Sequence, residues 1–374
     1  MNDPKPRASD QEGDILPPTG PEASEGTPSA PTKAVAMIAR LARIDPNSET
    51  LRRLGEGLLG AAVEAAATYA RDAISPATQA AYRRDWLAFA SWCEEREVDP
   101  GSLPIDPVVV AAYLASLAKT HGSSALRGRV AAIAHHHRRR GFAFLSTHPV
   151  IRETLSGIGR AHGKPVRPAA ALTSVEVKRL IETCAEDLRG LRDRALLLTG
   201  FAGAFRRSEL VGIDYHHLRF EVDAVVIHLP RSKADQEGKG VDVTLPRMRD
   251  AATGAVSETC PVRALESWLR KARIRRGAVF RAISVHGHLE AGLTARGVYT
   301  ILRHRAGLAK LTVHESERLS PHGLRAGLIT EAYLAGALDE QVAAHTRHGD
   351  LGAMRGYRRR ARITTDNPAR LVNL

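Results

Sequence analysis

One tyrosine stands among several arginines near the end of the chain, in the segment RHGDLGAMRGYRRR at 347–360. Tyr357 is flanked there by Arg355 and Arg358, and Arg347 begins the segment. A phenol has an ordinary pKa of about 10, and nearby guanidinium groups favour its ionised form. Tyr357 is therefore a candidate oxygen nucleophile for a phosphate group. The alternative is a packing residue at the edge of a basic surface.

His348 lies nine positions before Tyr357. On one continuous helix, at about 100° per residue, the two side chains would point to opposite sides. Gly349 and Gly352 lie between them and allow the chain to bend. The sequence therefore permits, without requiring, that both side chains act on one phosphate.

A histidine and an arginine three positions apart follow a helix start in the segment SPHGLRAG. Ser320 and Pro321 begin this helix, and His322 and Arg325 lie on one face of its first turn. The free backbone N–H groups and the positive end of the helix dipole favour an anion at this place. The pair predicts a phosphate-binding site, and the alternative is an ordinary capped helix with two polar residues.

Two further segments contain residues suited to phosphate chemistry. In AFRRSELVGI, Arg206 and Glu209 are three apart, which indicates either a local ion pair or a carboxylate that orients a phosphate-binding guanidinium. Lys233 follows a predicted strand and precedes the polar turn ADQEGKG. A lysine on such a hairpin can deliver a proton to a leaving oxygen, and the alternative is a solvated side chain.

The composition favours a polyanionic partner. The chain has 374 residues, with 54 Lys and Arg against 41 Asp and Glu, a formal net charge of +13 that indicates nucleic acid before a membrane. Apolar runs stay well short of the about 20 residues that cross a bilayer, and the N-terminus has no apolar signal core. Cys93, Cys184 and Cys260 lack metal-ligand spacing and are expected to be buried. These features predict a cytoplasmic protein.

The first half of the chain predicts an all-α domain. Residues 1–32 are polar and proline-rich, which predicts a disordered tail, and 33–74 form an N-terminal helical extension. Four helices follow within 75–160, with predicted starts at Ser75-Pro76, Asp106-Pro107, Ser123 and His148-Pro149. Together these helices predict a compact all-α domain.

The second half predicts a mixed α+β domain at 173–374, after a basic, proline-containing linker at 161–172. Thr173 and Glu176 form a capping box at its first helix. Strands are predicted near 211–215, 223–230 and 241–246, and helices at 261–274, 294–305, 321–336 and 338–346, followed by a short helix with Tyr357. The predicted fold class is mainly α with a small antiparallel β-sheet.

Taken in order, these motifs resemble the tyrosine recombinases, also called the phage integrase family. AFRRSEL is similar to the family's first arginine box, RSK at 231–233 to its strand-turn lysine, SPHGLR to its His-x-x-Arg box and RHGDLGAMRGY to its His-x8-Tyr ending. The resemblance covers roughly 75–374 and implies a core-binding domain at 75–160 and a catalytic domain from 173. Two positions depart from the pattern: the family usually has glycine where Arg347 stands, and often His or Thr where Ala326 stands.

The resemblance implies a site-specific DNA recombinase. The implied catalytic residues are Arg206, Lys233, His322, Arg325, His348 and the nucleophile Tyr357, with Glu209 in support. The two arginines hold the non-bridging phosphate oxygens, Tyr357 forms a 3′-phosphotyrosyl link, and Lys233 protonates the released 5′ oxygen. His322 is a general base or hydrogen-bond partner, and His348 helps to hold the phosphate and the nucleophile. Since the covalent link conserves the phosphodiester energy and arginines supply positive charge, neither a metal nor another cofactor is expected.

The implied partner is double-stranded DNA at its target sites, bound by a homotetramer that exchanges C-terminal segments after Tyr357. Accessory DNA-bending proteins are further candidate partners, no membrane is expected, and the protein is placed with the nucleoid. Further DNA contacts are predicted at Arg138, Arg139, Arg140, Lys164, Arg167 and Arg231. A metal site in the run HHHRRR is the weaker interpretation, because consecutive helical residues point in different directions.

Two other functions remain open from the sequence: a type IB topoisomerase, which uses the same tyrosine chemistry, and a DNA-binding regulator that kept the fold without catalysis. The intact set of six residues argues against the regulator. Tyr333 and Tyr299 are the alternative nucleophiles, and their helical surroundings predict core residues instead.

Overall fold

The computed structural model describes residues 57–144, 146–230, 240–348, 352 and 356–358. The chain divides into two compact units, Met1–Pro165 and Val166–Leu374, and their boundary falls within the predicted linker. The predicted tail at 1–32 and the first part of the helical extension lie outside the described residues. None of the helices in the described ranges combines the length and apolar character that a membrane span requires.

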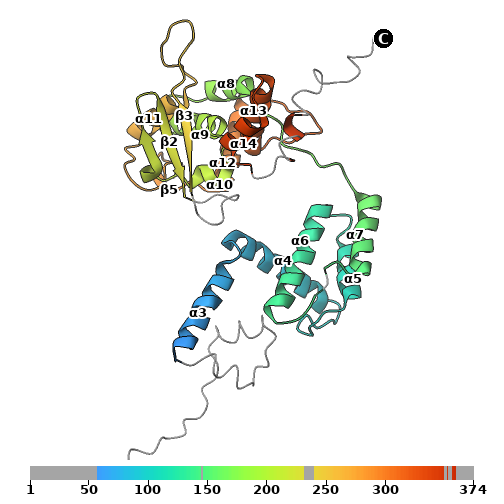
Figure 1. Cartoon of the computed structure of the whole chain (residues 1–374). Helices are drawn as coiled ribbons and strands as arrows, with labels where there is room; N and C mark the ends of the chain where they lie inside the picture. The colour runs from blue at the N-terminus through green and yellow to red at the C-terminus, as the bar shows by residue number, and fades with distance from the viewer. Residues whose placement is uncertain (1–56, 145, 231–239, 349–351, 353–355, 359–374) are drawn as a thin grey trace, which may run out of the picture. The chain divides into compact units, whose positions relative to one another are not determined.

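The first unit is helical throughout its described part (Figure 1). Ser75 caps the helix that follows by accepting from the Thr78 N–H at 3.3 Å, and Asp106 caps the next by accepting from Val108 at 2.7 Å. The four predicted helix starts are therefore confirmed. The helices are α3 (Gly57–Asp72), α4 (Pro76–Glu94), α5 (Pro107–Ser116), α6 (Ser123–Arg139) and α7 (Pro149–His162).

Three consecutive histidines in α6 take three different environments. His135 lies 4.9 Å from the Tyr82 ring, and His136 stacks on Trp86 at 3.4 Å between ring centroids. His137 is buried: its Nδ1–H donates to the Ile133 carbonyl, and its Nε2 accepts from the Ile105 N–H at 3.0 Å. The run therefore stabilises the first unit, whose core contains Phe89, Tyr113, Leu114 and Leu126.

The second unit surrounds a three-stranded antiparallel sheet with helices (Figure 1). Strand β2 lies between the other two, with Val226 opposite Arg219 on one side and Thr244 on the other. The core is largest around α9 and α11, where Trp268 is fully buried and donates to the Val279 carbonyl at 2.9 Å.

The elements of this unit are, in chain order, α8 (Ser174–Glu182), α9 (Leu188–Ala202), α10 (Arg207–Val211), the 3-10 turn η1 (Tyr215–His217), β1 (Leu218–Phe220), β2 (Ala224–Leu229), β3 (Val241–Pro246), α11 (Pro261–Lys271), β4 (Arg281–Ile283), β5 (Leu289–Gly292), α12 (Ala295–Leu308), α13 (His322–Leu334) and α14 (Asp339–Thr346). The fold is mainly α with small antiparallel sheets, as predicted. Cys93, Cys184 and Cys260 are buried, as expected.

The predicted strand at 211–215 is reduced to an isolated antiparallel bridge between Asp214 and Ala278, in which the Val279 N–H donates to the Ile213 carbonyl and the Tyr215 N–H donates to the Gly277 carbonyl, both at 2.9 Å. Val211 belongs to α10, and the Asp214 carboxylate accepts from the His216 N–H at the start of the 3-10 turn that precedes the first strand at 218–220. The small β4–β5 hairpin was not predicted, because its strands are short, only partly buried and shifted in register.

The last residues of the predicted linker bind along α13. The Leu172 N–H donates to the Gly323 carbonyl at 2.9 Å, and the Ala170 N–H donates to the Arg318 carbonyl at 3.0 Å. A Cβ atom at Gly323 would lie 2.4 Å from the Ala170 carbonyl oxygen, and one at Gly327 would lie 1.7 Å from that of Leu172. The two glycines therefore let this backbone contact the helix that carries His322 and Arg325.

We predict that Gly327→Ala destabilises the second unit by about 1–3 kcal/mol. The added methyl group would overlap the Leu172 carbonyl oxygen, and the backbone would have to shift to relieve the overlap. The matched control is Gly307→Ala in α12, where a Cβ meets nothing within 4 Å. Helix propensity alone should make that variant neutral or more stable by up to about 1 kcal/mol. Urea unfolding of both variants measures the difference, and equal stability of the two would contradict the prediction.

Candidate active site

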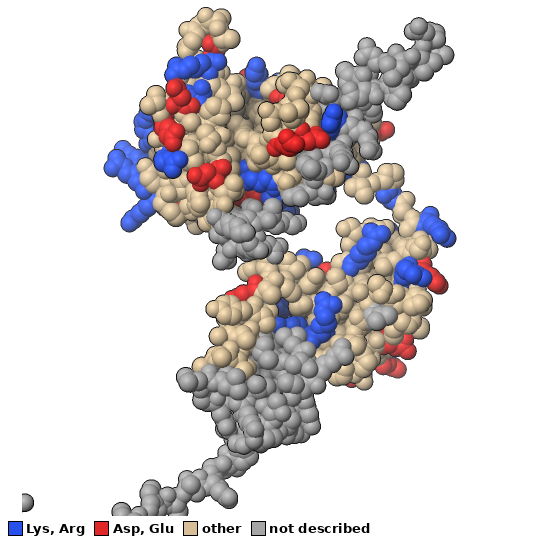
Figure 2. Space-filling view, viewed as in Figure 1, with Lys and Arg blue, Asp and Glu red and all other residues tan. Residues whose placement is uncertain are grey.

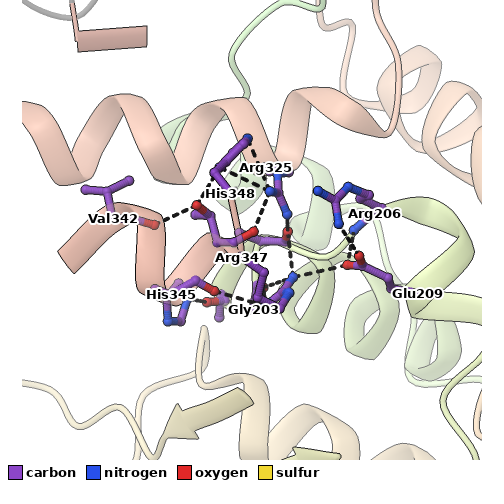
Figure 3. Close-up of polar contacts among 11 residues, drawn as sticks. Gly203, Arg206, Glu209, Arg325, Val342, His345, Arg347 and His348 are labelled. Carbon is purple, nitrogen blue, oxygen red and sulfur yellow. Dashed lines mark hydrogen bonds and ion pairs between the residues drawn. The ribbon is translucent and has the colours of Figure 1, made fainter. Parts of the chain in front are cut away.

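The helix α13 presents His322 and Arg325 differently. His322 is exposed in the first turn, whereas Arg325 is fully buried. The Arg325 Nη1 donates to the Ala204 carbonyl at 2.7 Å, and its Nη2 donates to the carbonyl of Thr346 (Figure 3). The two side chains therefore differ in exposure, because carbonyl groups of two distant segments hold Arg325 in the interior while His322 stays at the surface.

Arg206 and Glu209 form the ion pair that their spacing predicts. The Arg206 N–H donates to one oxygen of the Glu209 carboxylate at 2.9 Å, and its Nη1 donates to the other at 2.6 Å. The Glu209 side chain is 2% exposed and that of Arg206 is 24% exposed. Within the described ranges this carboxylate is the one hydrogen-bond acceptor of the Arg206 guanidinium, which leaves further N–H donors for a ligand.

A second guanidinium shares the same carboxylate. Arg347 Nη2 donates to Glu209 at 3.1 Å, and the Arg347 side chain is 5% exposed (Figure 3). Burial alone would raise the pKa of Glu209, but the Arg206 backbone N–H and the charges of Arg347 and Arg206 hold it below the ordinary value. Glu209 is therefore ionised at neutral pH and compensates part of the positive charge in the site.

His348 lies against Arg325 just after α14. The Arg325 Nη2 is 3.2 Å from both ring nitrogens of His348, and the Thr346 hydroxyl is 2.7 Å from its Nδ1. Burial and the nearby arginines, Arg325 first, lower the pKa of His348 to about 4. The ring is therefore neutral at neutral pH. Burial and the charges of Arg206 and Arg347 also lower the pKa of Arg325, to about 10, which still leaves it protonated.

Tyr357 lies in a short helical segment, 356–358, and its side chain lies close to His322 and His348. Its hydroxyl is 2.8 Å from the His322 Nε2, and its ring centroid is 6.3 Å from that of His348. The ring also packs against the small cluster of Ile329, Tyr333 and Val342. His348 and Tyr357 therefore meet, as the intervening glycines permit.

The other residues predicted to act on DNA lie in both units or outside the described residues. Lys233 and Arg231 lie outside the described residues, between β2 and β3. Arg138, Arg140 and Lys164 are exposed, Arg139 is half-buried, and Arg167 donates to the Glu317 carbonyl at 2.7 Å. Figure 2 shows Lys and Arg side chains on the surfaces of both units in the view drawn. A salt-sensitive interaction with a polyanion is consistent with these surfaces.

The two rival tyrosines differ from each other. Tyr333 is buried, and burial together with Asp339 raises its pKa to about 12, so the prediction of a core residue is confirmed. Tyr299 is half-buried on α12, with the guanidinium carbons of Arg296 and Arg303 about 6 Å from its ring centroid. The prediction that Tyr299 is a core residue like Tyr333 is therefore wrong.

Sequence reasoning missed the part that Arg347 takes in the site. Its hydrogen bonds reach residues more than 130 positions earlier in the chain, which no local spacing indicates. The one signal in the sequence was the arginine at position 347, where the family that the sequence resembles usually has glycine.

Comparisons with known proteins agree with the family that the sequence motifs resemble. The family model described as the phage integrase family matches residues 170–362. The chain is 34% identical over 295 residues to an integrase/recombinase XerD homologue of Selenomonas ruminantium, covering 78% of this chain and 83% of that protein. It is 28% identical over 262 residues to the tyrosine recombinase XerC of Xanthomonas axonopodis pv. citri (strain 306), covering 62% and 83%.

Two solved structures share the fold. The XerH site-specific recombinase bound to a palindromic difH substrate, in a post-cleavage complex, matches with a TM-score of 0.56 at 16% identity, over 92% of this chain and 90% of that chain. A lambda integrase dimer bound to a COC′ core site matches with a TM-score of 0.51 at 14% identity, over 76% and 72%.

The neutral state of His348 predicts a pH dependence of stability. Its pKa is lowered from 6.5 to about 4 on folding, so between these values the unfolded chain binds a proton that the folded chain does not. The free energy of unfolding should therefore fall as the pH decreases from 6.5 to 4, by at most about 1.4 kcal/mol per pH unit for one proton.

We expect His348→Gln to remove this contribution, so that the variant loses less stability than the wild type over that pH window. Urea unfolding between pH 4.5 and 7.5 measures it. His286→Gln, which changes an exposed histidine on the β4–β5 turn, is the control and should follow the wild-type curve. Parallel curves for the wild type and His348→Gln would show that His348 carries no such proton linkage.

Proposed function

Because the chain belongs to the phage integrase family, whose members are site-specific DNA recombinases, we propose that Tyr357 is the nucleophile with which it cleaves and rejoins DNA. The protein is a DNA strand-transferring enzyme, and neither a topoisomerase nor a silent regulator is favoured by its relatives. The observation that carries the proposal is the 2.8 Å distance between the Tyr357 hydroxyl and the His322 Nε2. A phenol needs such a partner, because its ordinary pKa leaves it protonated at neutral pH.

Arg206 and Arg325 are the proposed ligands of the two non-bridging phosphate oxygens. Positive charge there stabilises the additional negative charge that develops on the pentacoordinate phosphorus. Arg206 is partly exposed and has donors to spare, and the buried Nε of Arg325 has no acceptor within the described ranges. Such an orphaned donor is costly unless a ligand satisfies it. Since Arg325 is fully buried, the side chains that cover it must move when the phosphate binds.

The Tyr357 oxygen forms a bond to phosphorus while the bond from phosphorus to the 5′ oxygen breaks. The phenolic proton passes to His322, and Lys233 protonates the departing 5′ oxygen. His348 stays neutral and contributes a hydrogen bond to the phosphate or to the nucleophile. The reverse reaction with the 5′-hydroxyl of another strand rejoins the DNA, and no external energy source is required.

The proposed partner is a double-stranded DNA target site, to which Arg138, Arg139, Arg140, Lys164, Arg167 and Arg231 add phosphate contacts. We further propose that four protomers assemble on two duplexes and that the segment after Tyr357 contacts a neighbouring protomer. Accessory DNA-bending proteins belong to the same proposal, as does a cytoplasmic, nucleoid-associated location. A mixture of DNA-bound oligomers that never exceeds a dimer would contradict the tetramer.

We predict that Tyr357→Phe lowers covalent attachment to DNA by at least about 1,000-fold while leaving DNA affinity within a few fold, since only the reacting oxygen is removed. The probe is a pool of random-sequence duplexes carrying single nicks, which trap the cleaved intermediate. Protein-bound DNA is counted on denaturing gels, and affinity is measured with intact duplexes recovered from the trapped pool.

The matched control is Tyr299→Phe, which removes the hydroxyl of a half-buried tyrosine that also lies near two arginines. This variant should form the adduct at the wild-type rate. Peptide mapping should place the DNA on residue 357. An adduct of undiminished yield with Tyr357→Phe would remove the nucleophile from the proposal.

A further inference from the structure

Arg347 occupies a backbone conformation that favours glycine. It forms the C-cap of α14 with φ +59° and ψ +45°, in the left-handed region. A side chain there is disfavoured, because its Cβ crowds the neighbouring carbonyl oxygen. Any advantage of arginine over glycine at this position therefore comes from the contacts of its side chain.

The Arg347 guanidinium binds the segment that leads into Arg206. Its Nη1 and Nη2 both donate to the Gly203 carbonyl at 3.2 Å, and its Nη2 also donates to the Ala204 carbonyl at 3.2 Å. Its guanidinium carbon lies 5.0 Å from the Phe205 ring centroid. Arg347 therefore contacts each of the three residues that immediately precede Arg206.

The same guanidinium also neutralises the partner of Arg206. Glu209 accepts from Arg206 at 2.6 Å and from Arg347 at 3.1 Å, through different carboxylate oxygens. Without Arg347, the full negative charge of Glu209 would act on Arg206 alone. This would weaken the positive potential that Arg206 presents to a phosphate.

Arg347 has fewer donors left for a phosphate than Arg206 in this arrangement. Its two terminal nitrogens donate to backbone carbonyls and to Glu209, and its Nε, like that of Arg325, is buried without an acceptor among the described residues. Its contacts therefore lie mainly with the segment and the carboxylate that hold Arg206.

We propose that Arg347 is a positioning residue for DNA strand cleavage, which fixes the segment before Arg206 and shares Glu209 so that the Arg206 guanidinium keeps its place and charge for the phosphate. The proposal rests on the proposed function, in which Arg206 binds that phosphate. It assigns to Arg347 a part in transition-state stabilisation and not in DNA affinity.

The test compares Arg347→Gly and Arg347→Lys with the wild-type full-length chain. The measured quantities are the single-turnover rate of adduct formation on a nicked duplex recovered from the trapped pool, and the affinity for the intact duplex in the Tyr357→Phe background. Arg347→Gly should slow cleavage by about 10–100-fold and change affinity by less than about threefold. Arg347→Lys keeps the positive charge but loses the planar guanidinium, so it should cleave faster than Arg347→Gly and more slowly than the wild type.

Thermal unfolding separates positioning from simple support of the fold. Because glycine suits the left-handed backbone, Arg347→Gly should leave the second unit folded at the assay temperature. The matched control is Arg273→Gly, which also replaces an arginine at positive φ (+53°) in the same unit, but an exposed one. Its cleavage rate should equal that of the wild type. A rate loss in Arg347→Gly that only follows its folded fraction would overturn the proposal.

A double-mutant cycle with Glu209→Gln tests the route of the effect. If Arg347 acts through Glu209, its replacement by glycine should slow cleavage less in the Glu209→Gln background than in the wild type. If the rate losses of the two single variants simply multiply in the double variant, the inference is overturned. It is also overturned if Arg347→Gly cleaves at the wild-type rate while the adduct still requires Tyr357. Both outcomes leave the nucleophile assignment intact. An adduct that forms without Tyr357 would instead overturn the proposed function.

Discussion

An excess of buried positive charge is the constraint on which the active site depends. Three guanidinium groups, those of Arg206, Arg325 and Arg347, surround the single carboxylate of Glu209. Like charges at short range and low exposure are costly unless hydrogen bonds and opposite charges offset them. The Ala204 carbonyl helps by accepting from both Arg325 and Arg347. The remaining positive charge is what a phosphodiester would neutralise, so the site is electrostatically incomplete without an anionic ligand.

Three segments far apart in the sequence must be fixed together to hold this charge. The first is the turn at 203–205 between α9 and α10, whose carbonyls face the arginines. The second is α13, which is held by backbone contact with 170–172 through Gly323 and Gly327. The third is the end of α14, where the left-handed turn at Arg347 directs the chain to His348. The arginines thus contribute to the packing that positions them, because their hydrogen bonds join the first segment to the other two.

Local chemistry made much of the fold predictable. Helix starts followed from capping residues such as Ser75 and Asp106, and the pair of Arg206 and Glu209 followed from a spacing of three residues. Contacts within four residues are readable because the helix itself determines their geometry. The same reasoning overextended the strand predicted at 211–215, which is limited to an isolated bridge at Asp214 between α10 and a 3-10 turn.

Long-range contacts set the limit of sequence reasoning. The spacing of His322 and Arg325 predicted two neighbours in one helical turn, but it did not predict that carbonyls at 204 and 346 hold Arg325 in the interior while His322 is exposed. Likewise, nothing near Arg347 in the sequence indicates a carboxylate 138 positions away. Motif order predicted which residues form the candidate site, whereas their burial and partners depended on how distant segments pack.

The charge excess also restricts which groups can carry protons. A site crowded with arginines disfavours any additional cation, and this is why the pKa of His348, next to Arg325, is about 4. His348 is therefore neutral at neutral pH in this arrangement, and it can accept or donate a hydrogen bond in that form. In the proposed cleavage step, the phenolic proton of Tyr357 would be accepted by a group farther from the buried guanidiniums. His322 suits this role, because it lies at the exposed start of α13 with its Nε2 2.8 Å from the phenolic oxygen. In that proposal, phosphate binding and proton transfer fall to different residues, the buried arginines and the exposed histidine.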